Sequence, residues 1–201
     1  MNLNIVCKST AIRFSSIVIM FVVIVIQTQG QDKWSLSFEP GINVPTTEFV
    51  QTDLKTGYGG DVELSYHFTN FLSVYSGWGW HHFTTDESFL GSNIDIENTG
   101  YSVGLEFKYP TTSSIVTYTV GMGAVYSHIE AENWMGIIIG DTGHTFGPQV
   151  EAGISIDLGR HIIIKPFGRY RSIETDLDLD QIVTPVTLAF LTFGASLSYT
   201  F

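Results

Sequence analysis

The last eleven residues, "LTFGASLSYTF" (191–201), alternate strictly in character. Every second residue is apolar, including Leu197, Tyr199 and the final Phe201, and the residues between them are glycine or small hydroxyl residues. Alternation with a period of two is typical of a β-strand that has one apolar face. This apolar face continues to the end of the chain, which raises the question of which environment covers it.

The same alternation recurs along the chain and predicts an all-β fold. Seven further strand-like segments are residues 33–44, 57–68, 71–83, 100–109, 115–127, 148–158 and 162–172. The connections between the eight segments are long and tight in turn, as in an up-and-down meander with all long loops at one end. We therefore predict a closed eight-stranded antiparallel up-and-down barrel, with both ends of the barrel chain on the side of the tight turns.

The start of the chain has the features of a secretory signal peptide. A basic stretch without acids precedes an uncharged apolar stretch at 15–26, and small residues follow. We predict a signal peptide at 1–30 and a barrel domain at 31–201. The alternative is an uncleaved N-terminal anchor, but the apolar stretch is shorter than the roughly 20 residues of a membrane-spanning helix.

Charge and cysteine content exclude several classes of function. The chain has 20 acids and nine Lys or Arg residues, of which two lie in the predicted signal peptide, so the mature net charge would be −13. Nucleic acid, which requires a basic face, is excluded as a partner. The one cysteine, Cys7, also lies in the signal peptide, so disulfides and thiolate chemistry are not expected, and no cofactor is predicted.

The two faces of the predicted strands favour a membrane barrel over the alternative, a soluble exported barrel or sandwich. Aromatic residues gather near strand ends on the apolar faces, like the interfacial girdles of membrane barrels. The predicted interface aromatics are Trp34, Tyr66, Trp78, Trp80, Tyr101 and Tyr109. The opposite faces carry charges of both signs, which are costly in a dry core but can pair in a narrow lumen with trapped water. The predicted interior polar network is Glu39, Asp61, Glu63, Glu106, Lys108, Glu151, Asp157, Lys165, Arg169 and Arg171.

The chain resembles the small eight-stranded outer-membrane barrels of Gram-negative bacteria, the group that includes OmpX and the transmembrane domain of OmpA. The resemblance covers 31–201 and is most specific at "ASLSYTF" (195–201). This ending is similar to the signal recognised by the outer-membrane assembly machinery, which implies that role for Leu197, Tyr199 and Phe201. The resemblance also implies an outer-membrane location with periplasmic termini and extracellular long loops, and it implies outer-membrane lipid, lipopolysaccharide and the assembly machinery as partners.

The resemblance leaves function open, because one barrel fold hosts many activities. The acidic long loops favour a non-enzymatic structural or surface-interaction role, in contact with lipopolysaccharide or an extracellular ligand. Weak binding of divalent cations by these loops competes with a simpler interpretation, a solvated anionic surface. The alternatives are narrow porin-like passage of ions or small solutes and a lipid A-modifying enzyme with a site at the outer rim.

The polar residues near the outer rim do not predict catalysis or a metal site. Ser127 and His128 are neighbours on one strand and should point to opposite faces, so they could act together with Glu130 only across a bulge. Four histidines near the rim could meet at a metal, but their spacing matches no established template. These residues are His81, His82, His128 and His144.

Overall fold

A computed structural model describes most of the chain beyond the predicted signal peptide. The described residues are 33–49, 53–85, 87–88, 91–92, 94–112, 115–133, 135, 137–179 and 182–201. The predicted signal peptide and its cleavage site lie outside them. Within these ranges, no helix has the length and apolar character needed to cross a membrane.

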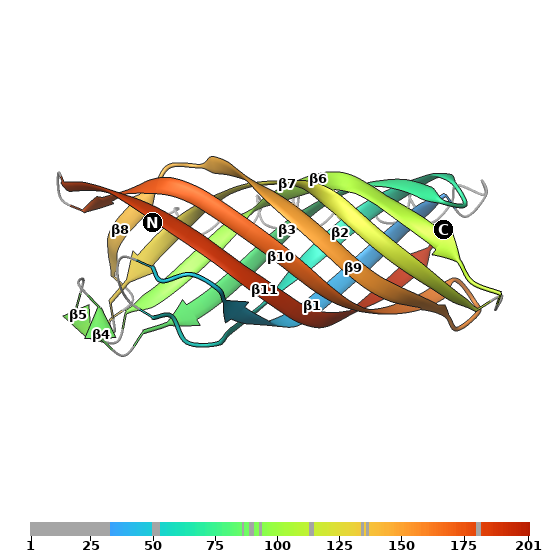
Figure 1. The fold of residues 1–201 in the computed structure, drawn as a ribbon, viewed down its shortest axis with the longest axis horizontal. Helices are drawn as coiled ribbons and strands as arrows, with labels where there is room; N and C mark the ends of the chain where they lie inside the picture. Colours follow the sequence, from blue (N-terminus) through green and yellow to red (C-terminus); the bar gives the residue numbers. More distant parts are fainter. Residues whose placement is uncertain are drawn as a thin grey trace, which may run out of the picture.

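The described residues form a ring of eight long antiparallel strands (Figure 1). The long strands are β1 (Trp34–Pro45), β2 (Gly57–Thr69), β3 (Leu72–Thr84), β6 (Asp95–Pro110), β7 (Val116–Glu132), β9 (Thr145–Asp157), β10 (Ile162–Leu179) and β11 (Ile182–Thr200). Each pairs with the next long strand, and β11 pairs with β1, which completes the ring. The predicted eight-stranded barrel is confirmed, and the pairing of β11 with β1 removes the exposed edges that an open sheet would have.

Three short strands add to one end of the ring. They are β4 (Glu87–Ser88), β5 (Gly91–Ser92) and β8 (Ile138–Thr142). The first two pair with each other, whereas β8 pairs with both β7 and β10. We call this end of the barrel the far end; in Figure 1 it lies on the left.

The opposite end, which we call the terminal end, joins the start of β1 to the end of the chain. The Trp34 amide donates to the Phe201 carbonyl at 3.1 Å, and the Phe201 amide donates to the Trp34 carbonyl at 2.7 Å. Tight turns connect β2 to β3 and β9 to β10 here, and the latter turn contains three consecutive residues with positive φ, Gly159 to His161. The terminal end is therefore the side of the tight turns, as the alternation of connection lengths predicts.

The strands run further toward the far end than the sequence pattern indicates. Pairing of β10 with β11 is continuous from Ile162 opposite Tyr199 to Leu179 opposite Ile182. Most of the segment predicted as the last long loop, 173–185, is therefore strand, and the prediction of a loop is wrong there. The reason is that the alternation changes sign after Arg171, so that apolar side chains beyond this point face inward.

The interior of the far end is an apolar core, which we call the apolar cap. Its members are Phe49, Leu54, Phe83, Ile94, Ile96, Val125, Ile129, Ala131, Ile173, Leu177, Val186, Leu188 and Phe190. None is more than 9% exposed, and the rings of Phe83 and Phe190 pack edge to face at 5.1 Å. The predicted polar lumen therefore occupies only the part of the interior nearer the terminal end.

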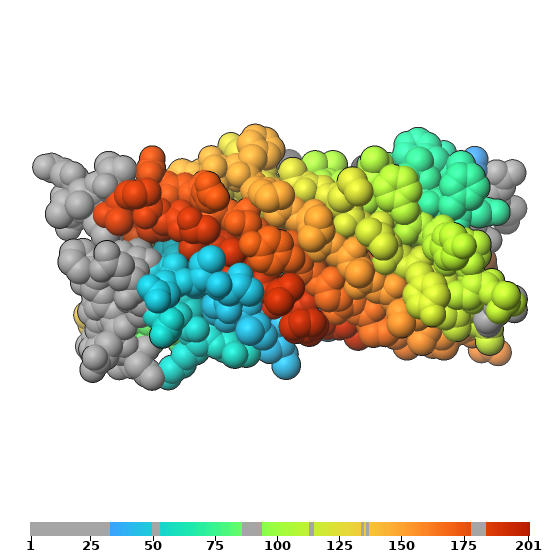
Figure 2. Space-filling model, viewed as in Figure 1, coloured from blue at the N-terminus to red at the C-terminus, as the bar shows by residue number. Residues whose placement is uncertain are grey.

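The exterior has the opposite pattern. From the terminal end to the middle of the barrel, the outward side chains are apolar and exposed, as at Phe38 (57%) and Phe193 (55%). Toward the far end, several outward residues on β3, β6, β7 and β10 are acidic or histidine, as at His82, Glu97, His128 and Glu174. In the space-filling view, side chains of β9, β10 and β11 cross the middle of the face that is seen, with blue-to-cyan side chains of the N-terminal strands beside them (Figure 2). An exposed apolar band of this kind suits contact with lipid rather than water.

Candidate functional site

The centre of the polar interior is Arg169 on β10, which is 2% exposed. Its Nε donates to Glu151 Oε2 at 2.7 Å, and its Nη1 donates to Asp61 Oδ2 at 2.8 Å. Its Nη2 donates to Glu39 Oε2. The three carboxylates come from β9, β2 and β1, so one guanidinium connects four strands across the barrel. Charge-assisted hydrogen bonds of this kind are stronger than neutral ones.

Arg171 forms a second layer, two residues further toward the far end. Its Nη2 donates to Asp61 Oδ1 at 2.7 Å, and its Nε donates to Gln149 Oε1 at 2.9 Å. Asp61 thus uses one oxygen for each arginine. The Nη1 of Arg171 also contacts Nε2 of the buried His81. This layer lies between Arg169 and the apolar cap.

Lysines form the layer nearest the terminal end. Lys165 Nζ donates to Glu151 Oε1 at 2.6 Å and to Glu106 Oε2 at 2.8 Å. Lys108 Nζ lies 3.8 Å from Glu106 Oε1. Glu63 is buried and accepts a hydrogen bond from Ser65 Oγ at 3.0 Å. The layer continues the same arrangement, in which inward bases meet inward acids; Lys165 reaches acids on β6 and β9, whereas Lys108 lies beside an acid of its own strand.

Nine of the ten residues predicted for the interior network lie in this interior, and Asp157 does not. Asp157 is exposed at the end of β9, where its Oδ1 accepts a hydrogen bond from the Gly159 amide at 2.7 Å. The alternation assigns Asp157 to the inward face of β9. The strand ends at this residue, however, and its side chain caps the turn that follows. Its assignment to the network was wrong for this reason.

The network also contains residues beyond the ten predicted ones. Tyr75 points inward from β3, and its hydroxyl accepts a hydrogen bond from Gln149 Nε2 at 2.7 Å. A Cβ at Gly104 would lie 2.3 Å from the Tyr75 hydroxyl, and one at Gly123 would lie 2.6 Å from it. The available signal was the alternation of β3, which places Tyr75 on the inward face; its position opposite glycines of β6 and β7 follows from the strand register.

These side chains leave little space in the lumen. One interior cavity, beside Asp61 and His81, has a volume of about 10 Å³, and another, beside Glu63 and Lys165, has about 30 Å³. Such volumes accommodate about one or two water molecules. At the level of Arg169, the described side chains therefore fill the cross-section of the barrel.

The aromatic residues predicted for the interfaces lie outward in two groups. Trp34, Tyr66 and Tyr109 lie toward the terminal end, where the Trp34 and Tyr66 rings are 4.8 Å apart. Trp78, Trp80 and Tyr101 lie further toward the far end, next to one another on β3 and β6. This spacing corresponds to two separate girdles. Their contact with the membrane interfaces is still a prediction.

A cluster of acids occupies the exterior beyond the second group of aromatics. We call it the acidic rim, and its members are Asp95, Glu97, Glu130, Glu132 and Asp141. Trp80 Nε1 donates to Glu97 Oε2 at 2.8 Å, which places the rim directly beside the aromatic group. Partial burial raises the pKa of Glu132, as do the neighbouring carboxylates of Glu97, Glu130 and Asp95. The rim is thus a site where negative charges crowd one another.

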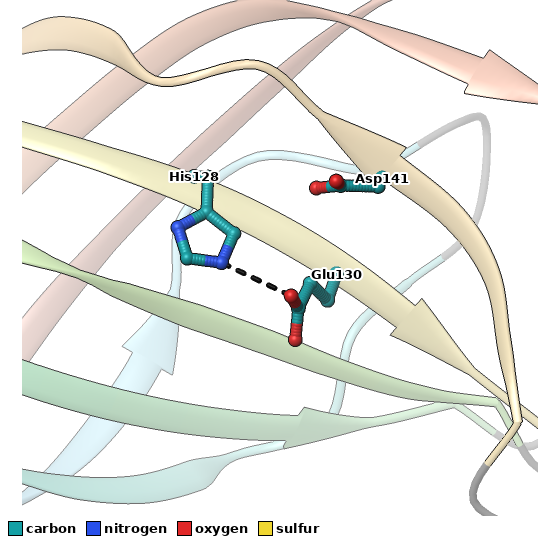
Figure 3. Close-up of side chains that lie close together, drawn as sticks. All are labelled: His128, Glu130 and Asp141. Carbon is teal, nitrogen blue, oxygen red and sulfur yellow. Dashed lines mark hydrogen bonds and ion pairs between the residues drawn. The ribbon is translucent and has the colours of Figure 1, made fainter.

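Histidines border the acidic rim. His128 Nε2 lies 3.1 Å from Glu130 Oε1, and the ligand atoms of His128, Glu130 and Asp141 lie within 4.8 Å of one another (Figure 3). The His128 and His144 rings are 4.5 Å apart. His82 Nδ1 lies 3.6 Å from Glu97 Oε1. Three of the four rim histidines therefore lie outside the barrel wall.

The barrel wall separates the members of two candidate groups near the rim, the serine–histidine pair and the four histidines. Ser127 faces inward, is 2% exposed and accepts a hydrogen bond from Asn98 Nδ2 at 3.1 Å, whereas His128 faces outward. His81 is buried inside, whereas His82 lies outside. The serine and histidine that a hydrolase site would need are thus on opposite faces, and the four histidines do not meet at one point.

Comparison with known proteins agrees with this architecture. The structure is similar to the Neisserial surface protein A, NspA, with 12% identity over 85% of this chain and 98% of that chain and a TM-score of 0.61. It is also similar to OprG from Pseudomonas aeruginosa, with 12% identity over 85% of this chain and 98% of that chain and a TM-score of 0.55. The outer membrane protein AlkL matches with 17% identity over 87% of this chain and 93% of that chain and a TM-score of 0.52. These identities show the fold alone.

A sequence profile gives the family. No curated protein sequence matches the chain. The profile described as "Outer membrane protein beta-barrel domain" matches residues 16–201, which is most of the chain. The chain therefore belongs to the outer membrane protein β-barrel domain family and is a small bacterial outer-membrane β-barrel protein.

Proposed function

We propose that this protein is a non-enzymatic, non-conducting barrel with a structural or surface-interaction role. In this proposal the far end faces the outside of the cell, and the acidic exterior of that end makes the functional contacts. The observation that carries the proposal is the segregation of charge between the interior and the two ends.

The basic residues are almost absent from the far end. Seven Lys or Arg residues follow the predicted signal peptide, and four of them lie in the interior network. Lys33 and Arg160 lie at the terminal end, so by position in the sequence Lys55 is the only Lys or Arg among the segments of the far end. By position in the chain, 13 of the 20 acids belong to these segments. The far end is therefore strongly anionic, with little internal neutralisation.

An anionic surface above the membrane suits one partner class in particular. Lipopolysaccharide is itself anionic, and divalent cations bridge carboxylates and phosphates through their oxygen ligands. We propose that the acidic exterior of the far end contacts lipopolysaccharide through such cations. The rigid support of this surface is favourable for binding, because β6, β7 and β10 hold the acids on paired strands rather than on free loops.

Binding of lipopolysaccharide tests the proposal. The barrel in nanodiscs is incubated with lipopolysaccharide and Mg²⁺, and co-sedimentation is compared with and without EDTA. A triple variant, Glu97→Gln, Glu132→Gln and Glu174→Gln, should lose at least fivefold in cation-dependent binding. Asp157→Asn, which removes an exposed acid at the terminal end, is the matched control. Equal binding by the triple variant and the control would refute the role of the far-end acids.

Passage of small solutes is the second candidate. A surface pocket of about 640 Å³ lies at the far end, lined by segments of β9, β10 and β11 and by residues 143–144. The pocket lies on the outer face of the wall, since Glu174 and Asp176 in its lining are exposed, so a route through the lumen would still have to pass the filled cross-section at Arg169. Planar-bilayer recordings should therefore show no steady conductance, whereas a conductance that changes in Arg169→Ala would favour this candidate.

A lipid A-modifying activity is the least supported alternative. Ser127 lies inside and His128 outside, so the candidate residues have no shared site. Mass spectrometry of lipid A from cells with and without the gene should give the same profile, and a gene-dependent change would require a different enzymatic site.

A further inference from the structure

The exterior residues His128, Glu130 and Asp141 have the composition of a transition-metal site rather than that of a general anionic surface. They provide one imidazole nitrogen and two carboxylates from β7 and β8. Mixed nitrogen and oxygen ligands of this kind suit Zn²⁺ and related divalent ions, whereas Ca²⁺ and Mg²⁺ prefer oxygen ligands alone. The imidazole therefore distinguishes this group chemically from the group of three glutamates beside it, which offers oxygen ligands alone.

The spacing of the ligand atoms fits one ion. His128 Nε2 and Glu130 Oε1 are 3.1 Å apart. Two ligands at the usual Zn–N and Zn–O distances from a tetrahedral ion lie about 3.3 Å apart, so these two atoms are already placed for a shared ion. The Asp141 oxygen lies within 4.8 Å of both, and it can approach by rotation of an exposed side chain.

The strand pairing explains why these residues meet. On β7, His128 and Glu130 are two residues apart and therefore face the same side of the wall. β8 returns beside β7, and its pairing places Asp141 opposite Glu130. In Figure 3 all three side chains lie on one side of these two strands. Strand β7 thus holds His128 and Glu130 on one face, and the pairing of β8 with β7 brings Asp141 beside them.

The surroundings favour a cation at this position. Glu97 and Glu132 also lie near Glu130, and the ligand atoms of these three acids fall within 4.8 Å of one another. These extra carboxylates add negative potential beside the site. His128 and Glu130 are each partly exposed and Asp141 is exposed, so an ion can enter from solution.

We propose that His128, Glu130 and Asp141 bind one Zn²⁺-like divalent transition-metal ion on the outside of the barrel at the far end. The ion ties β8 to β7 and leaves a coordination position for water or for an anionic group of a partner. The site deepens the proposed surface role and rests on it, because it would supply a cation at the surface that meets lipopolysaccharide. No catalytic step is assigned to the ion.

Metal binding to the purified barrel tests the proposal. The full barrel is prepared in detergent without a histidine tag, and Zn²⁺ binding is measured by titration calorimetry. Co²⁺ absorption serves as the probe of coordination. We expect one Zn²⁺ ion per chain with micromolar affinity, a loss of at least tenfold in His128→Gln and in Asp141→Asn, and weaker binding of Ca²⁺ and Mg²⁺.

Two variants provide matched controls. Glu174→Gln removes an exposed far-end acid outside the cluster, and His161→Asn removes a histidine at the terminal end, where asparagine tolerates the positive φ. Both should bind Zn²⁺ like the wild type, and heat-modifiable gel migration should show that every variant is folded.

Three outcomes would overturn the metal site. They are no micromolar Zn²⁺ binding by the wild type, full binding by His128→Gln, or equal losses in Glu174→Gln and Asp141→Asn. The last would indicate diffuse attraction to the acidic surface. Because the titration contains no lipopolysaccharide, its failure is distinguishable from failure of the lipopolysaccharide test.

Discussion

The guanidinium of Arg169 on β10 donates to the carboxylate of Asp61 on β2 at 2.8 Å, which joins residues 108 positions apart across the interior of the barrel. The same guanidinium also reaches acids on β1 and β9. Removal of one partner from a buried ion network leaves the others with uncompensated charge, which is more costly than the gain from forming the network. Arg169 is therefore the position where the interior should be most sensitive to substitution.

Arg169→Met should lower the free energy of unfolding by about 3–5 kcal/mol, because three carboxylates lose a shared partner. Urea unfolding in lipid vesicles provides the measurement. Arg160→Asn, at an exposed turn of the terminal end, is the control and should change little. Equal stability of the two variants would show that the network contributes nothing measurable.

Phe190→Ala should weaken the apolar cap. The Phe190 ring is fully buried and packs against Phe83 and His81, at 5.1 and 5.2 Å between ring centres. Truncation of a buried phenylalanine costs about 3–5 kcal/mol. Hydrogen exchange should become faster at Val186 and Leu188, while amides around Arg169 keep their protection. Faster exchange throughout the barrel would contradict the idea of two separate interior zones.

Phe201→Ser should reduce insertion into the outer membrane. The backbone of Phe201 pairs with Trp34 and closes the ring at the terminal end, and its ring lies 6.3 Å from Tyr199. The substitution keeps those backbone hydrogen bonds and removes only the aromatic group. Phe71→Ser, at an exposed turn of the same end, is the control. The fraction of heat-modifiable barrel in membranes is measured, and a similar fraction for both variants would leave Phe201 with no special role in assembly.

Glu97→Gln should lower the pKa of Glu132. Partial burial raises this pKa, and so do the carboxylates of Glu97, Glu130 and Asp95. A raised carboxyl pKa means that the folded barrel binds the proton more tightly, so this contribution to stability is present at low pH and is lost as the pH rises through the folded pKa. NMR titration of Glu132 in both proteins measures the change, and an unchanged value would show that the rim carboxylates do not interact.

The sequence predicts the barrel well because one rule, strict alternation, governs most of each strand. The rule fails where the environment changes. Tyr170 and Glu174 both face outward, and Arg171 and Ile173 both face inward. The facing is therefore unchanged, but the polar residue is inside at 171 and outside at 174, because an apolar core fills the interior beyond Arg171. This exchange of polarity looks like the end of a strand in the sequence, which is why the pattern predicts loops where the strands extend toward the far end.

Which interior side chains contact one another is harder to predict than which residues face inward. Alternation places Arg169 and Asp61 inside, but their contact depends on the stagger of strands around the ring, which no single strand encodes. Asp157 shows a different difficulty. The alternation predicts on which face it lies, but it does not predict that the strand ends there. The approach of Asp141 to His128 depends on β8, a strand that the sequence analysis did not predict.

The proposed surface role depends most directly on the acidic far end facing the outside of the cell. In a Cys7→Ser background the chain has no other cysteine, so single cysteines can be labelled in cells with a membrane-impermeant maleimide. Glu174→Cys should be labelled on intact cells, Leu158→Cys only after the outer membrane is permeabilised, and the buried Ile173→Cys in neither case. Labelling of Leu158→Cys on intact cells, with Glu174→Cys protected until permeabilisation, would contradict the account.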